Sequence, residues 1–119
     1  MAVHVPKLLY QGQPAATDTT LYTVPADTQT VVTSIIATNT NSATKYFTIH
    51  FVQSGDSVAN DVALIFQQDL KGSGDSTGSQ TFIMDTPFIL ETAGDLISAI
   101  QETATAITVT IFGYEESTA

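Results

Sequence analysis

The amino-acid sequence predicts an all-β fold, a single-domain antiparallel β-sandwich of jelly-roll type with one short helical turn near residues 57–62. Three observations support this fold class. Val, Ile, Thr, Phe and Tyr dominate the apolar stretches, and these residue types fit a pleated, half-buried surface better than a helix. Apolar and polar residues alternate with a period of two in several stretches. Turn-forming residues recur between short apolar runs, as expected for many short strands.

The clearest alternation lies in residues 46–52, where Phe47 and Ile49 fall on one face and Tyr46 and His50 on the other. We expect His50 to be partly buried and hydrogen-bonded. Residues 28–38 contain adjacent apolar pairs, so both faces of that strand are partly apolar. Strands are expected over residues 8–11, 19–24, 28–38, 46–52, 63–69, 80–85, 88–91, 96–101 and 106–114.

One segment departs from the strand pattern. Apolar residues recur at helical spacing after Ser57, a candidate N-cap, so we expect a helical turn that gives way to a strand near Ala63. These residues are Val58, Val62, Ile65 and Phe66. The Gly- and Ser-rich stretch 72–79 is predicted to be an exposed, mobile loop.

The charge balance is strongly acidic. Twelve Asp and Glu residues against three basic residues give a net charge of −9, which would repel a phosphate backbone. No apolar run reaches the roughly 18 residues of a membrane helix, and residues 1–14 lack the apolar core of a signal peptide. We therefore expect synthesis in the cytoplasm and no nucleic-acid or membrane partner. Without cysteine, burial and backbone hydrogen bonds must hold the domain together.

The sequence contains no set of residues that matches a known catalytic or metal site. Residues 74–78 match the G-x-S-x-G pattern of hydrolases, but no apolar strand leads into them and no helix follows. Both histidines, His4 and His50, precede Ser76, whereas that hydrolase fold places its histidine last. Two histidines alone do not supply the three protein ligands of catalytic zinc, and the acidic loop residues do not match a calcium-binding loop. We predict a protein that is not an enzyme, with no cofactor and no metal.

Several apolar residues exceed the one apolar face per strand that a sandwich needs. Either strand ends, loops and bulges cover them, or they form an interface, where Tyr and Phe are favoured. The segment 1–14 offers a similar pair of alternatives, an arm laid on a neighbour or an edge strand, while residues 15–119 form the sandwich domain. The predicted interface residues are Val5, Lys7, Leu9, Tyr10, Val32, Ile36, Tyr46, Phe112 and Tyr114.

Four stretches resemble small virion structural proteins of tailed bacteriophages. They are residues 15–26, residues 31–41, residues 90–97 with the pattern L-x-x-x-G-D-x-I, and residues 107–115. Together they span most of the chain in the expected order, and each is a strand-and-turn pattern without a catalytic signature. The resemblance implies a β-sandwich or jelly-roll subunit, often trimeric, that decorates or cements a capsid or forms part of a tail or fibre.

On the strength of this resemblance we expect a capsid decoration or cement subunit on the exterior of a virion. Its partners would be the major capsid protein and further copies of itself in a homotrimer. The alternative is a tail-fibre or host-attachment module that binds carbohydrate through Tyr22, Tyr46 and Tyr114. Position in head or tail, oligomer number and strand order stay open at this point.

Overall fold

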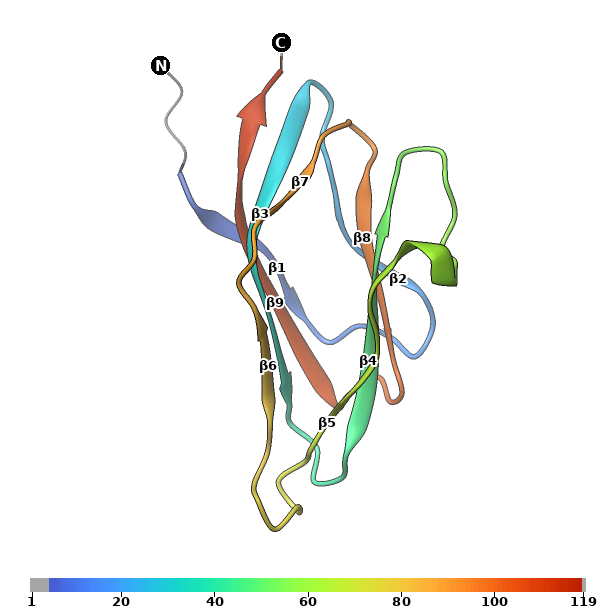
Figure 1. The fold of residues 1–119 in the computed structure, drawn as a ribbon, viewed down its shortest axis with the longest axis vertical. Coiled ribbons are helices and arrows are strands. Elements are labelled where there is room, and N and C mark those ends of the chain that lie inside the picture. The colour runs from blue at the N-terminus through green and yellow to red at the C-terminus, as the bar shows by residue number, and fades with distance from the viewer. Residues whose placement is uncertain (1–4, 119) are drawn as a thin grey trace.

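A computed structural model describes residues 5–118 and arranges them in two antiparallel sheets that face each other (Figure 1). Sheet A contains β1, β9, β3 and β6 in that order, with β7 also paired to β3, and sheet B contains β2, β8, β4 and β5. The predicted all-β sandwich is thus confirmed. The strands are β1 Lys7–Gly12, β2 Thr19–Thr23, β3 Thr28–Asn39, β4 Lys45–Val52, β5 Ala63–Leu70, β6 Thr81–Met84, β7 Phe88–Leu90, β8 Leu96–Gln101 and β9 Ile107–Ser117.

The strands pair in a nested order. β1 pairs with β9, β2 with β8, β3 with β6 and β7, and β4 with β5, so segments from opposite ends of the chain lie side by side. A long hairpin that is rolled into two sheets produces such nesting, which is how a jelly roll is built. The two-sheet sandwich is observed directly, and the jelly-roll path stays our interpretation of this order.

The helical turn predicted near residues 57–62 is a single 3-10 turn, η1, at Asn60–Val62. Its N-cap is Ala59 and not Ser57, and no side chain caps it. The backbone N–H of Ser57 instead donates a hydrogen bond to the carboxylate of Asp56. A turn of three residues is a common length for a 3-10 helix and leads directly into β5. No helix within residues 5–118 has the length and apolar character needed to cross a membrane.

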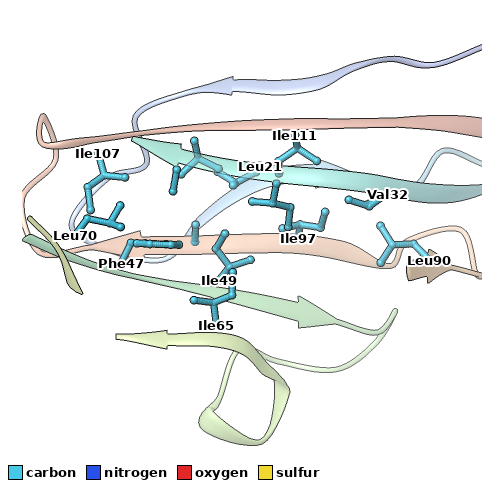
Figure 2. Close-up of a cluster of buried hydrophobic side chains, with 14 of the residues drawn as sticks. Leu21, Val32, Phe47, Ile49, Ile65, Leu70, Leu90, Ile97, Ile107 and Ile111 are labelled. Atoms are coloured by element: carbon cyan, nitrogen blue, oxygen red, sulfur yellow. The ribbon is translucent and has the colours of Figure 1, made fainter. Parts of the chain in front are cut away.

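The core lies between the two sheets (Figure 2). Phe47 and Ile49 of β4 and Ile97 of β8 project from sheet B, and Ile107 and Ile111 of β9 project from sheet A. Each of these side chains is at most 1% exposed. The ring of Phe47 also meets that of Phe82 in an edge-to-face arrangement with centroids 5.9 Å apart, a favoured geometry for aromatic pairs.

Val32 belongs to this core, which corrects its prediction as an interface residue. Strict alternation along β3 would put Val32 and Ile36 on the same face. The register between β3 and β9 shifts between Val32 and Ser34, so a bulge at Thr33 reverses the alternation. Val32 therefore faces inward with no exposed surface, whereas Ile36 faces outward and is partly exposed.

The N-terminal segment contributes an edge strand to sheet A. β1 pairs with β9, and a second bulge falls between Leu8 and Tyr10. Leu9 and Tyr10 are partly buried and pack against the core. The first four residues, including His4, lie outside the described residues.

Backbone hydrogen bonds anchor the loop over residues 72–79. The N–H groups of Ser73 and Gly74 donate to the carbonyl oxygens of Asn41 and Ser42, at 3.1 and 2.8 Å. The chain passes so close here that a Cβ atom on Gly72 would lie 2.5 Å from the Ser42 carbonyl. Glycine is therefore needed for this contact between two loops.

Candidate functional site

Apolar side chains gather on the outer face of sheet A, in three cross-strand rows set by the strand register. The first row joins Tyr114, Val31 and Ile89, the second joins Leu8, Phe112 and Ser34, and the third joins Gln11, Thr110, Ile36 and Ile83. Several of these side chains are well exposed for apolar residues, including Ile83 at 62%, Leu8 at 50%, Ile89 at 49% and Phe112 at 38%. We call this surface the sheet-A face.

The two bulges in sheet A build this face. Both lie next to Gly113, whose β9 position is opposite Val32 of β3. A Cβ atom on Gly113 would come within 2.2 Å of the Val31 carbonyl oxygen and 2.9 Å of the Leu9 side chain. The hydroxyl of Thr33 in the β3 bulge donates to the carbonyl oxygen of Phe112 at 3.2 Å. The glycine thus allows the bulged strands to close around β9 and keeps Phe112 directed outward.

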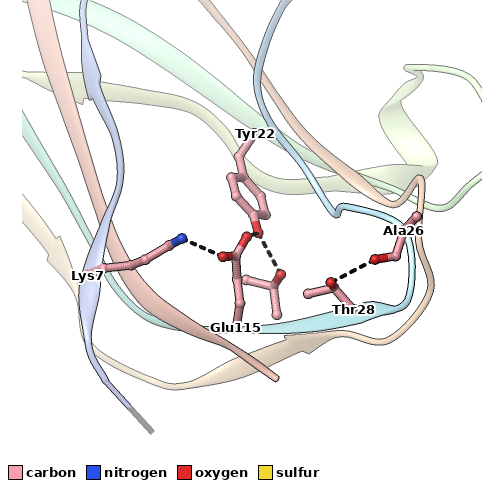
Figure 3. Close-up of polar contacts among 6 residues, drawn as sticks. Lys7, Tyr22, Ala26, Thr28 and Glu115 are labelled. Carbon is pink, nitrogen blue, oxygen red and sulfur yellow. Dashed lines mark hydrogen bonds and ion pairs between the residues drawn. The ribbon is translucent and has the colours of Figure 1, made fainter. Parts of the chain in front are cut away.

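No side chain in the three rows is charged, although the chain carries a net charge of −9. Lys7, the basic residue of β1, does not reach this surface. Its ammonium group forms an ion pair with Glu115 on the other side of the sheet (Figure 3). Lys7, which the sequence predicts as an interface residue, is therefore engaged within the subunit.

Lys7 belongs to a polar cluster that joins the two sheets at one end of the sandwich. The Tyr22 hydroxyl from sheet B donates a hydrogen bond to Glu115 and lies 2.7 Å from the Thr30 hydroxyl in sheet A (Figure 3). Burial, then the hydrogen bond with Glu115, raises the pKa of Tyr22 to about 12. The hydrogen bonds from Lys7 and Tyr22 lower the pKa of the Glu115 carboxyl. We interpret the cluster as a structural contact that holds the two sheets together at this end.

Sheet B carries a different feature on its outer face, a groove of about 480 Å³. A bulge in β5 shapes it, because Phe66 and Gln67 together face the single residue Thr48 of β4. Gln67 has a φ of 44°, and its N–H donates to the Thr48 hydroxyl at 2.9 Å. We call this the sheet-B groove, and its lining includes Asp18, Tyr46, His50, Phe66, Ile100 and Glu102.

His50 is the most unusual residue of this groove. Its side chain is only 5% exposed, and its Nδ1 has no hydrogen-bond partner among residues 5–118. The sequence predicts a partly buried, hydrogen-bonded histidine, so the structure corrects that expectation. The nearby turn η1 contacts β4 and packs over this part of the sheet.

The predicted interface residues do not form one surface. Ile36, Phe112 and Tyr114 share the sheet-A face, whereas Tyr46 lies in the groove on the opposite sheet. Val5 is 64% exposed just before β1. Leu9 and Tyr10 turn toward the core, and burial raises the pKa of Tyr10.

Sequence reasoning missed Ile83 and Ile89 as surface residues. Both lie in predicted strands and alternate with the partly buried Phe82, Met84 and Phe88. The alternation of residues in these two strands indicates two faces. Which face is exposed depends on how β6 and β7 pair with β3.

Residues 5–118 contain no group of three or more His, Asp or Glu side chains placed to hold a metal ion. In the segment 74–78, Thr77 donates to the Asp75 carboxylate through its hydroxyl at 2.6 Å and its backbone N–H at 2.8 Å. These bonds lower the pKa of Asp75. They stabilise a surface turn in the place where a hydrolase would carry its serine.

No family model and no curated protein matches this chain. Among solved structures it is similar to a protein of Bacillus endospore appendages, which are described as a novel family of disulfide-linked pili. The sequence identity is 16%, the TM-score is 0.49, and the alignment covers 98% of this chain and 88% of that one. At this level of similarity we transfer neither a function nor a partner, and the chain has no cysteine for a disulfide link.

No comparison supports the predicted capsid decoration or cement subunit, and the tail-fibre alternative has no support either. The similar solved structure belongs to a bacterial spore appendage, and no family or curated match supports a capsid protein. The major capsid protein is likewise unsupported as a partner.

Proposed function

We propose that this chain is a non-catalytic structural subunit that assembles with further copies of itself through the sheet-A face. The proposal rests on the three adjacent rows of uncharged side chains on that face. Four large apolar side chains in these rows are at least 38% exposed. Contiguous exposed apolar surface on a soluble domain typically marks an interaction site. Phe and Tyr, present here as Phe112 and Tyr114, are enriched at such interfaces.

The uncharged sheet-A face allows a second copy to be the partner. Two copies of a subunit with a net charge of −9 repel each other, and this repulsion is smallest when the surfaces that meet carry no charge. The sheet-A face meets that condition, and two copies of it can pair around a two-fold axis. Acidic side chains then stay at the rim and in solvent.

The magnitude of the apolar contribution predicts weak, concentration-dependent association. Fully burying one large apolar side chain contributes roughly 1.5–3 kcal/mol, and the exposed part of Leu8, Ile83, Ile89 or Phe112 contributes about half of that. When two copies pair through this face, eight such side chains are buried, and their combined contribution of about 6–12 kcal/mol only matches the cost of association, which is about 4–15 kcal/mol. Stable assemblies would therefore need several contacts per subunit acting together.

Sedimentation velocity over a wide range of protein concentrations tests the proposal. We expect a monomer at low concentration and larger species as the concentration rises. If the face pairs with itself, the assembly is a dimer. The homotrimer that the resemblance implies would require the face to contact a different surface of the next copy.

Ile83→Lys introduces a charge into the face and should shift the association to much higher concentration. Leu64→Lys is the matched control, because Leu64 is a 40% exposed apolar residue of β5 in the opposite sheet. A protein that stays monomeric at every concentration, or equal effects of the two substitutions, would exclude the proposal.

A further inference from the structure

An exposed aromatic ring and a small side chain lie next to each other at the centre of the sheet-A face. Phe112 of β9 is directly opposite Ser34 of β3 in the strand register, and Phe112 is 38% exposed. Ser34 has the smallest side chain of the three rows. The bulge creates this pair, because an unbroken register would place Thr33 opposite Phe112. The face therefore carries a large ring beside a position with little side-chain volume.

The sheet is also interrupted on the other side of Ser34. β6 ends at Met84 and β7 begins at Phe88, and neither strand pairs with Ser34. The rows before and after it continue onto these two strands with Ile89 and Ile83, which are 49% and 62% exposed. Ser34 thus occupies a low position in the face, between rows that end in larger apolar side chains.

Two copies can bring the ring and the low position together. When two identical faces pack on each other, the two-fold axis lies in the plane of the contact. An axis that runs along the strands between β9 and β3 places β9 of each copy over β3 of the other. These two strands are neighbours at the centre of sheet A and share its longest pairing. This axis therefore centres the contact on the face and gives a large overlap of the two copies.

From these observations we infer that Phe112 of each copy packs on Ser34 of the other copy, so that this residue pair sets the register of the assembly. The inference rests on the self-association proposed above. The same axis brings Tyr114 over Val31, so again a larger side chain meets a smaller one. Close fit of this kind gives an interface the packing density of a protein interior. Aromatic side chains seated near the centre of an interface also contribute much of its binding energy.

An axis that runs across the strands, along the second row, gives a poorer fit. Each residue of that row would then meet its own copy, with Phe112 on Phe112 and Ser34 on Ser34. The two rings would hold the sheets apart, and a void would remain where the two serines face each other. Side chains that line a void lose their van der Waals contacts. Matching the ring of one copy to the low position of the other avoids this loss.

Opposite charges introduced at the two positions test the contact. Phe112→Lys and Ser34→Glu each bury a charge without a partner, so each variant alone should associate more weakly than the wild type. In an equimolar mixture, the new ammonium group meets the new carboxylate at one contact, and the other contact keeps its native residues. Sedimentation velocity should therefore show that the mixture associates at about tenfold lower concentration than either variant alone.

Thr38→Glu is the matched control for Ser34→Glu. Thr38 is a partly exposed residue of the same strand and the same face, and it pairs with Thr108, four residues before Phe112 in β9. Its mixture with Phe112→Lys should associate no more tightly than its components. The reversed pair, Phe112→Glu with Ser34→Lys, repeats the test with independent proteins, so a single variant that fails to fold does not prevent a result. Circular dichroism checks that each variant is folded.

The inference is overturned if neither charge pair associates more tightly as a mixture than as separate variants. It is also overturned if Thr38→Glu restores association with Phe112→Lys as well as Ser34→Glu does. Either result leaves self-association through the sheet-A face in place, provided that the wild type associates and Ile83→Lys weakens it. A wild-type chain that stays monomeric at every concentration overturns both, so the two failures are distinguishable.

Discussion

The hydroxyl of Tyr22 donates a hydrogen bond to the carboxylate of Glu115, a residue 93 positions later in the chain. Tyr22 lies in the β2 edge strand of sheet B, and Glu115 lies near the end of β9 in sheet A. The bond therefore joins the two layers of the sandwich. Thr30 and Lys7 complete the network around it.

Tyr22 should ionise at a higher pH than an ordinary tyrosine. Its pKa is raised to about 12 by burial and by the hydrogen bond to Glu115. A folded-state pKa above the unfolded value of about 10 means that this stabilisation is fully present below pH 10 and is lost as the pH rises toward 12. An ultraviolet pH titration checks the order of ionisation. Tyr22→Phe should remove the most alkaline phase, and loss of an earlier phase would contradict the assignment.

Glu115→Gln should reduce the dependence of stability on acid pH. Lys7 and Tyr22 lower the pKa of Glu115, so its contribution is present above the unfolded pKa of about 4.3 and is lost as the pH falls through the lower folded value. Both partners are partly exposed, so we expect a loss of only about 1 kcal/mol at neutral pH. Urea unfolding at a series of pH values measures it. Glu91→Gln, at an exposed position just after β7, is the control, and equal effects would argue against a specific clamp.

Gly113→Ala should be strongly destabilising. The added Cβ would lie 2.2 Å from the Val31 carbonyl oxygen, so the bulged strands must separate. We expect a loss of about 2–4 kcal/mol in the free energy of unfolding. Gly55→Ala is the comparison, because its Cβ would meet no atom within 4 Å and only the φ of 86° opposes it, at a cost of about 1 kcal/mol. Similar losses in the two variants would show that β9 can shift to make room.

Gln101→Leu should destabilise the domain by about 2–4 kcal/mol. The Gln101 side chain is 2% exposed, and its amide donates to the carbonyl oxygens of Pro14 and Ile107 at 2.7 and 3.1 Å. Its oxygen accepts from the Ile107 N–H at 2.8 Å. Leucine leaves these backbone groups buried without partners. Thermal unfolding measures the loss, and Gln68→Leu, at an exposed position of β5, should cost well under 1 kcal/mol.

The strands were predictable because their signals are local. Phe47 and Ile49 alternate with polar neighbours, and Pro, Gly and Asp mark the turns, so a pattern of a few residues defines each strand. The position of the helical turn before Ala63 was predictable, although its N-cap is Ala59 and not Ser57. A cap depends on where the chain enters the turn, and sequence spacing alone does not show that.

The surfaces were only partly predictable, because they depend on pairing between distant strands. A one-residue shift in register exchanges the two faces of a strand. The bulge at Thr33 places Val32 in the core and Ile36 on the surface, and it forms where β3 passes around Gly113 of β9. Lys7 meets Glu115 and not a partner for the same reason, since only the folded sheet brings β1 beside β9.

By itself, the sequence of this protein determined an acidic, cysteine-free, all-β domain, because composition and short-range periodicity carry that information. Only the tertiary structure decided that Ile83, Ile89 and Phe112 share one uncharged face and that Tyr46 lies beside a buried His50 on the opposite sheet. The physical reason is that a strand's own residues specify its alternation, whereas its neighbours and bulges decide which side of that alternation meets solvent.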